Sequence, residues 1–167
     1  LAAAYFMMNK LEMARDFAAE SLDLRQQQFA RHQGHRQQSV DDAEHAQFAH
    51  SNINQQYGIA LAADNLALIH HRNGQCLKAI ELYEKSLSIK QALARDVLVA
   101  QFSHELARGY LNLASAYRRQ ESFTKAHALL QEGLYVMQEQ SQNDECNRER
   151  SELKAKILEM LALVTEQ

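Results

Sequence analysis

The sequence has 167 residues, of which 46% are apolar and 23% charged, values close to those of an average globular domain. This composition excludes a chain that is disordered throughout, and the length fits one domain with a sizeable core. The absence of proline and the presence of only five glycines exclude an all-β fold, which needs many turn residues. A net charge of −3 without blocks of like charge excludes the basic surface of a nucleic-acid-binding protein. We therefore predict an all-α fold and no nucleic-acid partner.

Cysteine usage and hydropathy bear on the compartment. Cys76 and Cys146 lie far apart and match no metal or redox spacing, which favours a reducing, cytoplasmic location. No apolar run approaches the ~20 residues that cross a bilayer, so we expect no membrane partner. The apolar segment 1–8 lacks a basic flank and is not a signal peptide. Because the sequence begins with Leu1, we expect a fragment of a longer chain.

In chain order, the first predicted element is a partial repeat at 1–33. Residues 32–38 are predicted to form a loop, and Ser39 with the acidic residues after it marks the start of a helix. This helix either continues as one long helix or is interrupted by an extra hairpin within 25–64. We assign 39–94 to a repeat with a long first helix.

Two copies of an internal repeat align without a gap. Matched residues are offset by 47, as in Asn65 and Asn112, since 112 minus 65 is 47. The same offset relates Leu66 to Leu113, Ala67 to Ala114, Ala79 to Ala126, Tyr83 to Leu130 and Leu87 to Leu134. Apolar residues at every third or fourth position indicate amphipathic helices; after Gly74 they are Leu77, Ile80, Tyr83 and Leu87. Cys76 is expected at a packing position between helices.

Turn signals divide the copies into helix hairpins. Asn73–Gly74 breaks the second unit, and residues 120–122 take the same place in the third unit, 97–141. A last helix, within 144–166, stands where the first helix of a further repeat would be. We predict that it caps the stack.

These residues resemble the tetratricopeptide repeat family, which places small residues where helices cross and large residues beside them. The period of 47 exceeds the usual ~34, and no proline closes the second helix. The longer period is similar to that of kinesin light chains and bacterial peptide-sensing regulators. The resemblance implies a TPR-like α-solenoid, a right-handed superhelical stack of antiparallel hairpins with a C-terminal capping helix. It also implies a scaffold whose first helices line a concave face that binds a protein or peptide.

The resemblance places candidate binding residues on the first helices of the two copies. Asn65 and Asn112 match the position of an asparagine ladder, whose amides offer a donor and an acceptor to a peptide backbone. The neighbouring candidates are Asp64, Leu68, His71, Arg72, Arg108, Leu111, Ser115, Arg118 and Arg119. The arginines favour an acidic ligand or one with a free carboxylate. Alternatively, the asparagines bridge neighbouring helices and the arginines form an ordinary solvated face.

Signatures of catalysis and metal binding are missing from the sequence. It has no Gly-rich phosphate loop and no nucleophile elbow, and His104–Glu105 lacks the second histidine of a zinc motif. We expect no enzymatic activity, no cofactor and no metal. Two alternatives to a binding scaffold stay open. One is a sensor or spacer module that regulates an effector domain elsewhere. The other is homo-oligomerisation through the C-terminal helix, which aligns Leu153, Ile157, Met160, Leu161 and Val164.

Overall fold

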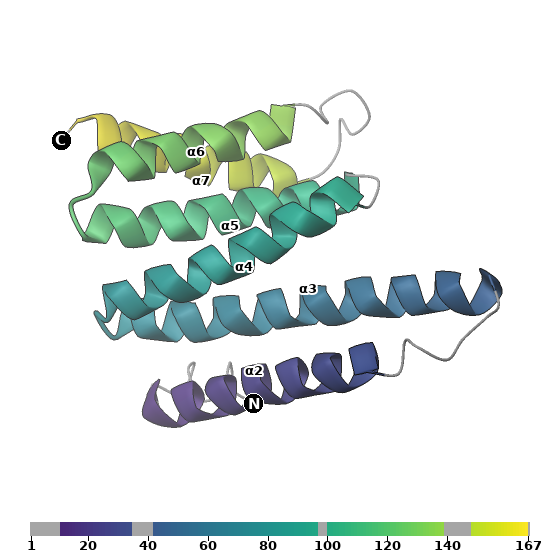
Figure 1. Ribbon diagram of the computed structural model, residues 1–167. Coiled ribbons are helices and arrows are strands. Elements are labelled where there is room, and N and C mark those ends of the chain that lie inside the picture. Colours follow the sequence, from purple (N-terminus) through teal and green to yellow (C-terminus); the bar gives the residue numbers. More distant parts are fainter. Residues whose placement is uncertain (1–10, 35–41, 97–99, 139–147, 167) are drawn as a thin grey trace.

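The computed structural model describes residues 11–34, 42–96, 100–138 and 148–166, and within them it contains helices and no strands. The helices are α2 (Leu11–Gly34), α3 (Asp42–Arg72), α4 (Cys76–Asp96), α5 (Ala100–Arg119), α6 (Phe123–Gln138) and α7 (Arg148–Thr165). Figure 1 shows α2 to α6 stacked in chain order, with α7 behind α6 and the α3–α4 and α5–α6 turns at the same end of the stack. The predicted all-α class is confirmed for the described residues.

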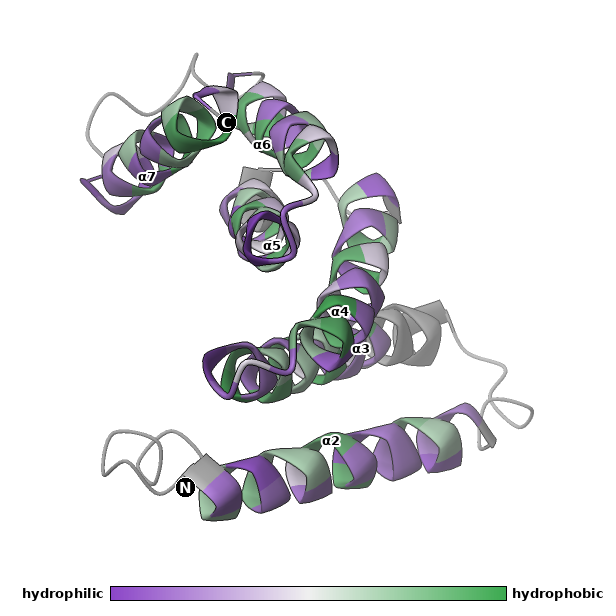
Figure 2. Ribbon diagram, turned by 90° about the vertical axis from the view of Figure 1, so that its left-hand side faces the viewer, coloured by the Kyte–Doolittle hydropathy of each residue, from purple (hydrophilic) through white to green (hydrophobic). Residues whose placement is uncertain are grey.

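Each helix packs on its neighbours in sequence, and α5 also contacts α7. Figure 2 shows α5 and α7 on one side of the stack and α4 and α6 on the other. The second helix of each hairpin therefore packs both on its own first helix and on the first helix of the next unit. This arrangement is that of a helical-repeat array, in which each unit contacts its neighbours only.

Small residues occupy matched, buried positions on both helices of each hairpin. Ala67 and Ala114 on the first helices, and Ala79 and Ala126 on the second helices, are fully buried. Since interhelical distance depends on the side chains at the contact, alanine at these positions permits close packing. The offset of 47 read from the sequence therefore corresponds to equivalent positions in the two hairpins.

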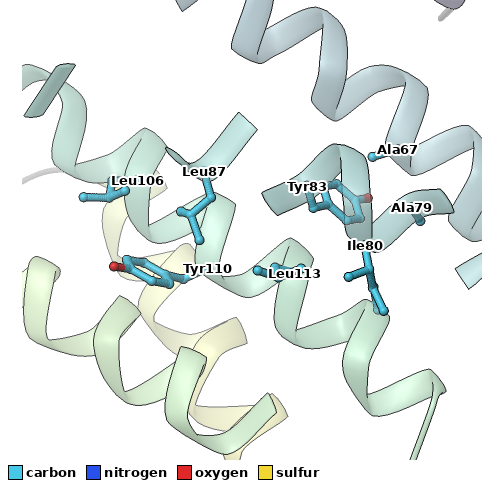
Figure 3. Close-up of a cluster of buried hydrophobic side chains, with 9 residues drawn as sticks. Ala67, Ala79, Ile80, Tyr83, Leu87, Leu106, Tyr110 and Leu113 are labelled. Carbon is cyan, nitrogen blue, oxygen red and sulfur yellow. The ribbon is translucent and has the colours of Figure 1, made fainter. Parts of the chain in front are cut away.

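A central apolar cluster joins α3, α4 and α5 (Figure 3). Its members are Ala67, Ala79, Ile80, Tyr83, Leu87, Leu106, Tyr110, Leu113 and Ala116. Leu77, predicted to lie in the apolar stripe of α4, is 67% exposed, so that part of the prediction is wrong. Leu77 lies in the first turn of α4, next to the α3–α4 turn.

The segment with the weakest sequence pattern is one long helix. The 31 residues of α3 are continuous from Asp42 to Arg72, which contradicts an extra hairpin in that range. The periodicity of α3 is weak because α2 and α4 pack on it from different sides, so buried residues cover most of its circumference and leave exposed a stripe that includes Asn65, Leu68 and Arg72. The predicted loop at 32–38 is wrong for residues 32–34, which continue helix α2. Residues 35–38 and Ser39 lie outside the described residues.

The two hairpin turns have the same backbone conformation. Gly74 has a φ of 76°, and its match Glu121 has a φ of 57°. The amide of Gln75 donates to the carbonyl of His70, and the amide of Ser122 donates to that of Tyr117. These bonds, with a residue in the left-handed region, define a Schellman ending for α3 and α5. The predicted breaks at Asn73–Gly74 and 120–122 are thus confirmed.

Helix α7 departs from the two first helices that precede it. Leu153, Ile157 and Val164 are buried against α5 and α6. Lys154 and Leu161 stand where α5 has the buried alanines Ala107 and Ala114, and Leu161 is half-buried against the same apolar cluster. Because both side chains are larger than alanine, this part of α7 is less suited to a close helix contact than the matched part of α5. Residues 144–147, at the start of the predicted capping helix, lie outside the described residues, and homo-oligomerisation through α7 stays a prediction.

Candidate functional site

The candidate residues differ in how far they reach the surface. Asn65, Leu68, Arg72 and Arg119 are exposed, and His71, Arg108, Leu111, Asn112, Ser115 and Arg118 are half-buried. Asp64 is buried. We use the term α3/α5 face for the exposed and half-buried members of this set. Leu111 also packs against the apolar cluster that joins α5, α6 and α7.

The C-terminal ends of α3 and α5 bring four candidate side chains together. The guanidinium of Arg119 donates to the backbone carbonyl of His71 over 2.8 Å, which ties the two helix ends to each other. Burial lowers the pKa of His71, and the nearby positive charges of Arg119, Arg118 and Arg72 lower it further. The guanidinium groups of Arg72, Arg118 and Arg119, which we call the cationic cluster, therefore lie near His71, and His71 favours its neutral form.

One donor in this cationic cluster has no protein partner. Nε of Arg118 is buried and makes no hydrogen bond among the described residues. A buried donor left without a partner costs free energy, and a carboxylate is the acceptor that a guanidinium binds best. The end of the α3/α5 face is therefore suited to an anionic group.

Two candidate residues are engaged inside the protein. Asp64 Oδ2 accepts a hydrogen bond from Lys90 Nζ at 2.5 Å, and Lys90 is fully buried. Lys90 Nζ also lies 4.0 Å from Glu105 Oε2, and Glu105 accepts a hydrogen bond from Arg108. Asp64 and Arg108 therefore belong to an ion-pair network that links α3, α4 and α5. Loss of either partner would leave a buried charge uncompensated.

A tyrosine completes this network. The hydroxyl of Tyr57 donates to the Glu105 carboxylate. Burial raises the pKa of Tyr57 to about 12, and the negative charge of Glu105 contributes to the rise. Gly109 lies beside the network, and a methyl group there would meet Leu87 Cδ1 at 3.1 Å. The close approach of α5 to α4 thus depends on a residue without a side chain.

Lys90, Glu105 and Tyr57 were not among the residues predicted from the sequence. One signal could have pointed to Lys90, because it continues the apolar stripe of Tyr83 and Leu87 at helical spacing. A lysine in such a stripe is buried only if it is paired. Its partners lie on other helices, so spacing alone could not name them.

Comparison with known families identifies the fold class. The tetratricopeptide repeat family model matches residues 59–96 and 106–139. The two matches begin 47 residues apart, since 106 minus 59 is 47, which is the offset read from the sequence. These two segments belong to the tetratricopeptide repeat family, whose members generally mediate protein–protein interactions. No curated protein matches the chain.

Two further findings concern membranes and metals. Across residues 11–34, 42–96, 100–138 and 148–166, no helix has the length and apolar character needed to cross a bilayer. The same residues bring together no group of three or more histidine, cysteine, aspartate or glutamate side chains suited to a metal ion.

Proposed function

We propose that the α3/α5 face binds a protein or peptide partner through an acidic residue or a free carboxylate. The observation that supports it most is the cationic cluster of Arg72, Arg118 and Arg119 around His71, with the buried Nε of Arg118 left unpaired among the described residues. Asn65 and Asn112 lie on the same helices and offer amides to the backbone of the ligand. The proposed role is that of a non-catalytic, cytoplasmic scaffold, which rests on the sequence arguments above.

The electrostatic part of the proposal follows from the geometry of the helix ends. A carboxylate near Arg118 would satisfy a buried donor, and the neighbouring guanidinium groups would hold its charge. Asp64, by contrast, is neutralised by Lys90 within the protein and adds little negative field at the surface. The face therefore favours acidic over basic peptides.

The test uses fluorescein-labelled octapeptides that carry zero to three acidic residues and a free or amidated C-terminus. We expect the affinity to rise with acidic content, and the variant Asn65→Ala with Asn112→Ala to weaken binding about tenfold or more. A matched control replaces the exposed α6 residues Gln131 and Gln138 with alanine. Circular dichroism checks that helicity is kept. Equal affinity for neutral and acidic peptides, or no effect of the asparagine pair, would remove the assignment.

A further inference from the structure

A hollow opens between the two hairpin turns, beside the α3/α5 face. It has a volume of about 480 Å³ and is lined by residues 74–78, which include the first turn and the start of α4, and by Arg119 and Gln120 at the C-terminal end of α5. Arg119 belongs both to this hollow and to the cationic cluster. The hollow is therefore continuous with the proposed binding face.

The hollow lies at a position where the two repeat copies carry residues of different size. The match of Cys76 in the next unit is Phe123, since 123 minus 76 is 47. Phe123 is half-buried and packs against the apolar cluster of α5, α6 and α7. Cys76 is also half-buried but much smaller, and it lines the open space between the first turn and the end of α5. The hollow therefore lies beside the repeat position that carries an aromatic ring one unit later.

Leu77, the residue after Cys76, also differs from its match in the next unit. Leu77 is 67% exposed and lines the hollow, whereas its match in the next unit is the polar Thr124. A leucine exposed to this extent gains free energy when a partner covers it. The small side chain of Cys76 and the exposed apolar side chain of Leu77 therefore lie next to each other at the hollow.

The positive charges that line the hollow favour apolar ligands that also carry a negative charge. Lys78 and Arg119 line the hollow, and among the residues that the structure describes no acidic one does. A guanidinium and an ammonium group at the edge of an apolar hollow favour a ligand that places a carboxylate next to its apolar group.

We propose that this hollow binds an aromatic side chain of a protein partner that carries a carboxylate beside it, as in an aromatic residue next to an acidic one or at a chain end. The ring takes the place that Phe123 takes in the following hairpin, and the carboxylate pairs with Lys78 and Arg119. The inference rests on the proposed function in one respect, because the ring belongs to a protein partner.

The test uses a small probe, so it does not depend on the partner. N-acetylphenylalanine, which carries a ring and a carboxylate, is titrated into the ¹⁵N-labelled 167-residue chain and followed by NMR. We expect shifts at the amides of residues 74–78, Arg119 and Gln120 and saturation at millimolar concentration. N-acetylphenylalaninamide, without the charge, should bind about fivefold more weakly. Absence of saturable shifts at these amides would overturn the proposal.

The decisive variant fills the hollow from within. Cys76→Phe copies the residue of the next repeat and should weaken the probe at least about tenfold, whereas Cys76→Ser keeps the volume and the affinity. Arg119→Gln, which leaves the hollow open, should weaken N-acetylphenylalanine but not its amide. Unchanged probe affinity in Cys76→Phe and in Arg119→Gln would overturn the proposal. If one variant does not fold, unchanged affinity in the other is enough to overturn it.

The two proposals fail independently. If the unmodified chain binds no acidic octapeptide, the α3/α5 face is not the binding site. If N-acetylphenylalanine still binds this chain and the variant Asn65→Ala with Asn112→Ala, the hollow is supported. Octapeptide binding without any response to the probe would do the reverse.

Discussion

The α3–α4 hairpin with its junction to α5, and the α5–α6 hairpin with its junction to α7, carry opposite chemistry at matched positions. Lys90 of α4 is fully buried and pairs with Asp64, whereas the matched Met137 of α6 is 4% exposed and the match of Asp64 is Leu111. Leu111 packs against the cluster that contains Met137. A charged pair in the first hairpin is thus replaced by an apolar pair in the second.

The other contacts across the two junctions follow the same division. Gln91 donates to the hydroxyl of Tyr110 at 2.9 Å, and the hydroxyl of Tyr117 donates to Glu84 at 2.6 Å. On α7 the matches of the two tyrosines are Ile157 and Val164, both buried. Both members of the Asp64–Lys90 pair change between the two units, whereas Gln91 is matched by Gln138 although its partner Tyr110 is replaced by Ile157. The first junction gains directional contacts, and the second gains apolar burial.

The largest expected effect comes from breaking the charged junction on one side. Lys90→Met should lower the free energy of unfolding by about 3–5 kcal/mol, because Asp64 and Glu105 lose the cation between them. Urea unfolding measures the change. The exposed Lys85 of the same helix is the matched control, and Lys85→Met should change stability by less than about 0.5 kcal/mol. Equal effects of the two substitutions would contradict the role of the pair.

A smaller effect is expected when both partners change together. Asp64→Leu with Lys90→Met copies the Leu111–Met137 pair into the first hairpin and should bring stability to within about 1 kcal/mol of the unmodified chain. The double-mutant cycle then gives a coupling free energy of at least about 2 kcal/mol. Losses that simply add would show that the second junction is not a template for the first.

The smallest expected effect is a pH dependence of the free energy of unfolding, which should arise in the first hairpin and not in the second. The pKa of His71 is lowered by burial and by Arg119, Arg118 and Arg72. The unfolded chain therefore binds a proton at His71 more readily than the folded protein does. Its contribution to the free energy of unfolding is present above the ordinary pKa of 6.5 and decreases as the pH falls below it.

The measurement compares urea midpoints at pH 7.5 and 5.5 in the unmodified chain and in His71→Gln. The variant should lose less stability on acidification. The match of His71 in the next unit is an arginine, Arg118, so the effect belongs to the first hairpin. An identical pH dependence in the two proteins would contradict it.

The sequence predicted the parts of the fold that repeat. The alanine pairs and the two turns follow from the offset of 47, because close helix crossings and Schellman endings demand particular residues. The exposure of Leu77 could not be predicted, since periodicity shows which side of a helix is apolar but not where its neighbour ends. Lys90 and Asp64 lie 26 residues apart on different helices, so their pairing depends on tertiary packing.

For the candidate site, too, the sequence predicted matched positions but not the contacts that the side chains make. The offset placed Asn65 and Asn112 at matched positions, but it could not show that Asp64 and Arg108 bind partners within the protein. It also could not show the hollow at Cys76, because a missing volume is visible only after Phe123 has been located in the packed structure.

The turn at Glu121 has a consequence for exchanging parts between the hairpins. A residue with a side chain in the left-handed region costs about 1–2 kcal/mol relative to its usual conformation, yet Glu121 adopts the same backbone shape as Gly74. The helices on either side must therefore impose that shape. The two connectors are interchangeable in geometry, so a designer could transplant the Asn73–Gln75 tripeptide into the second hairpin as a ready-made, less strained joint.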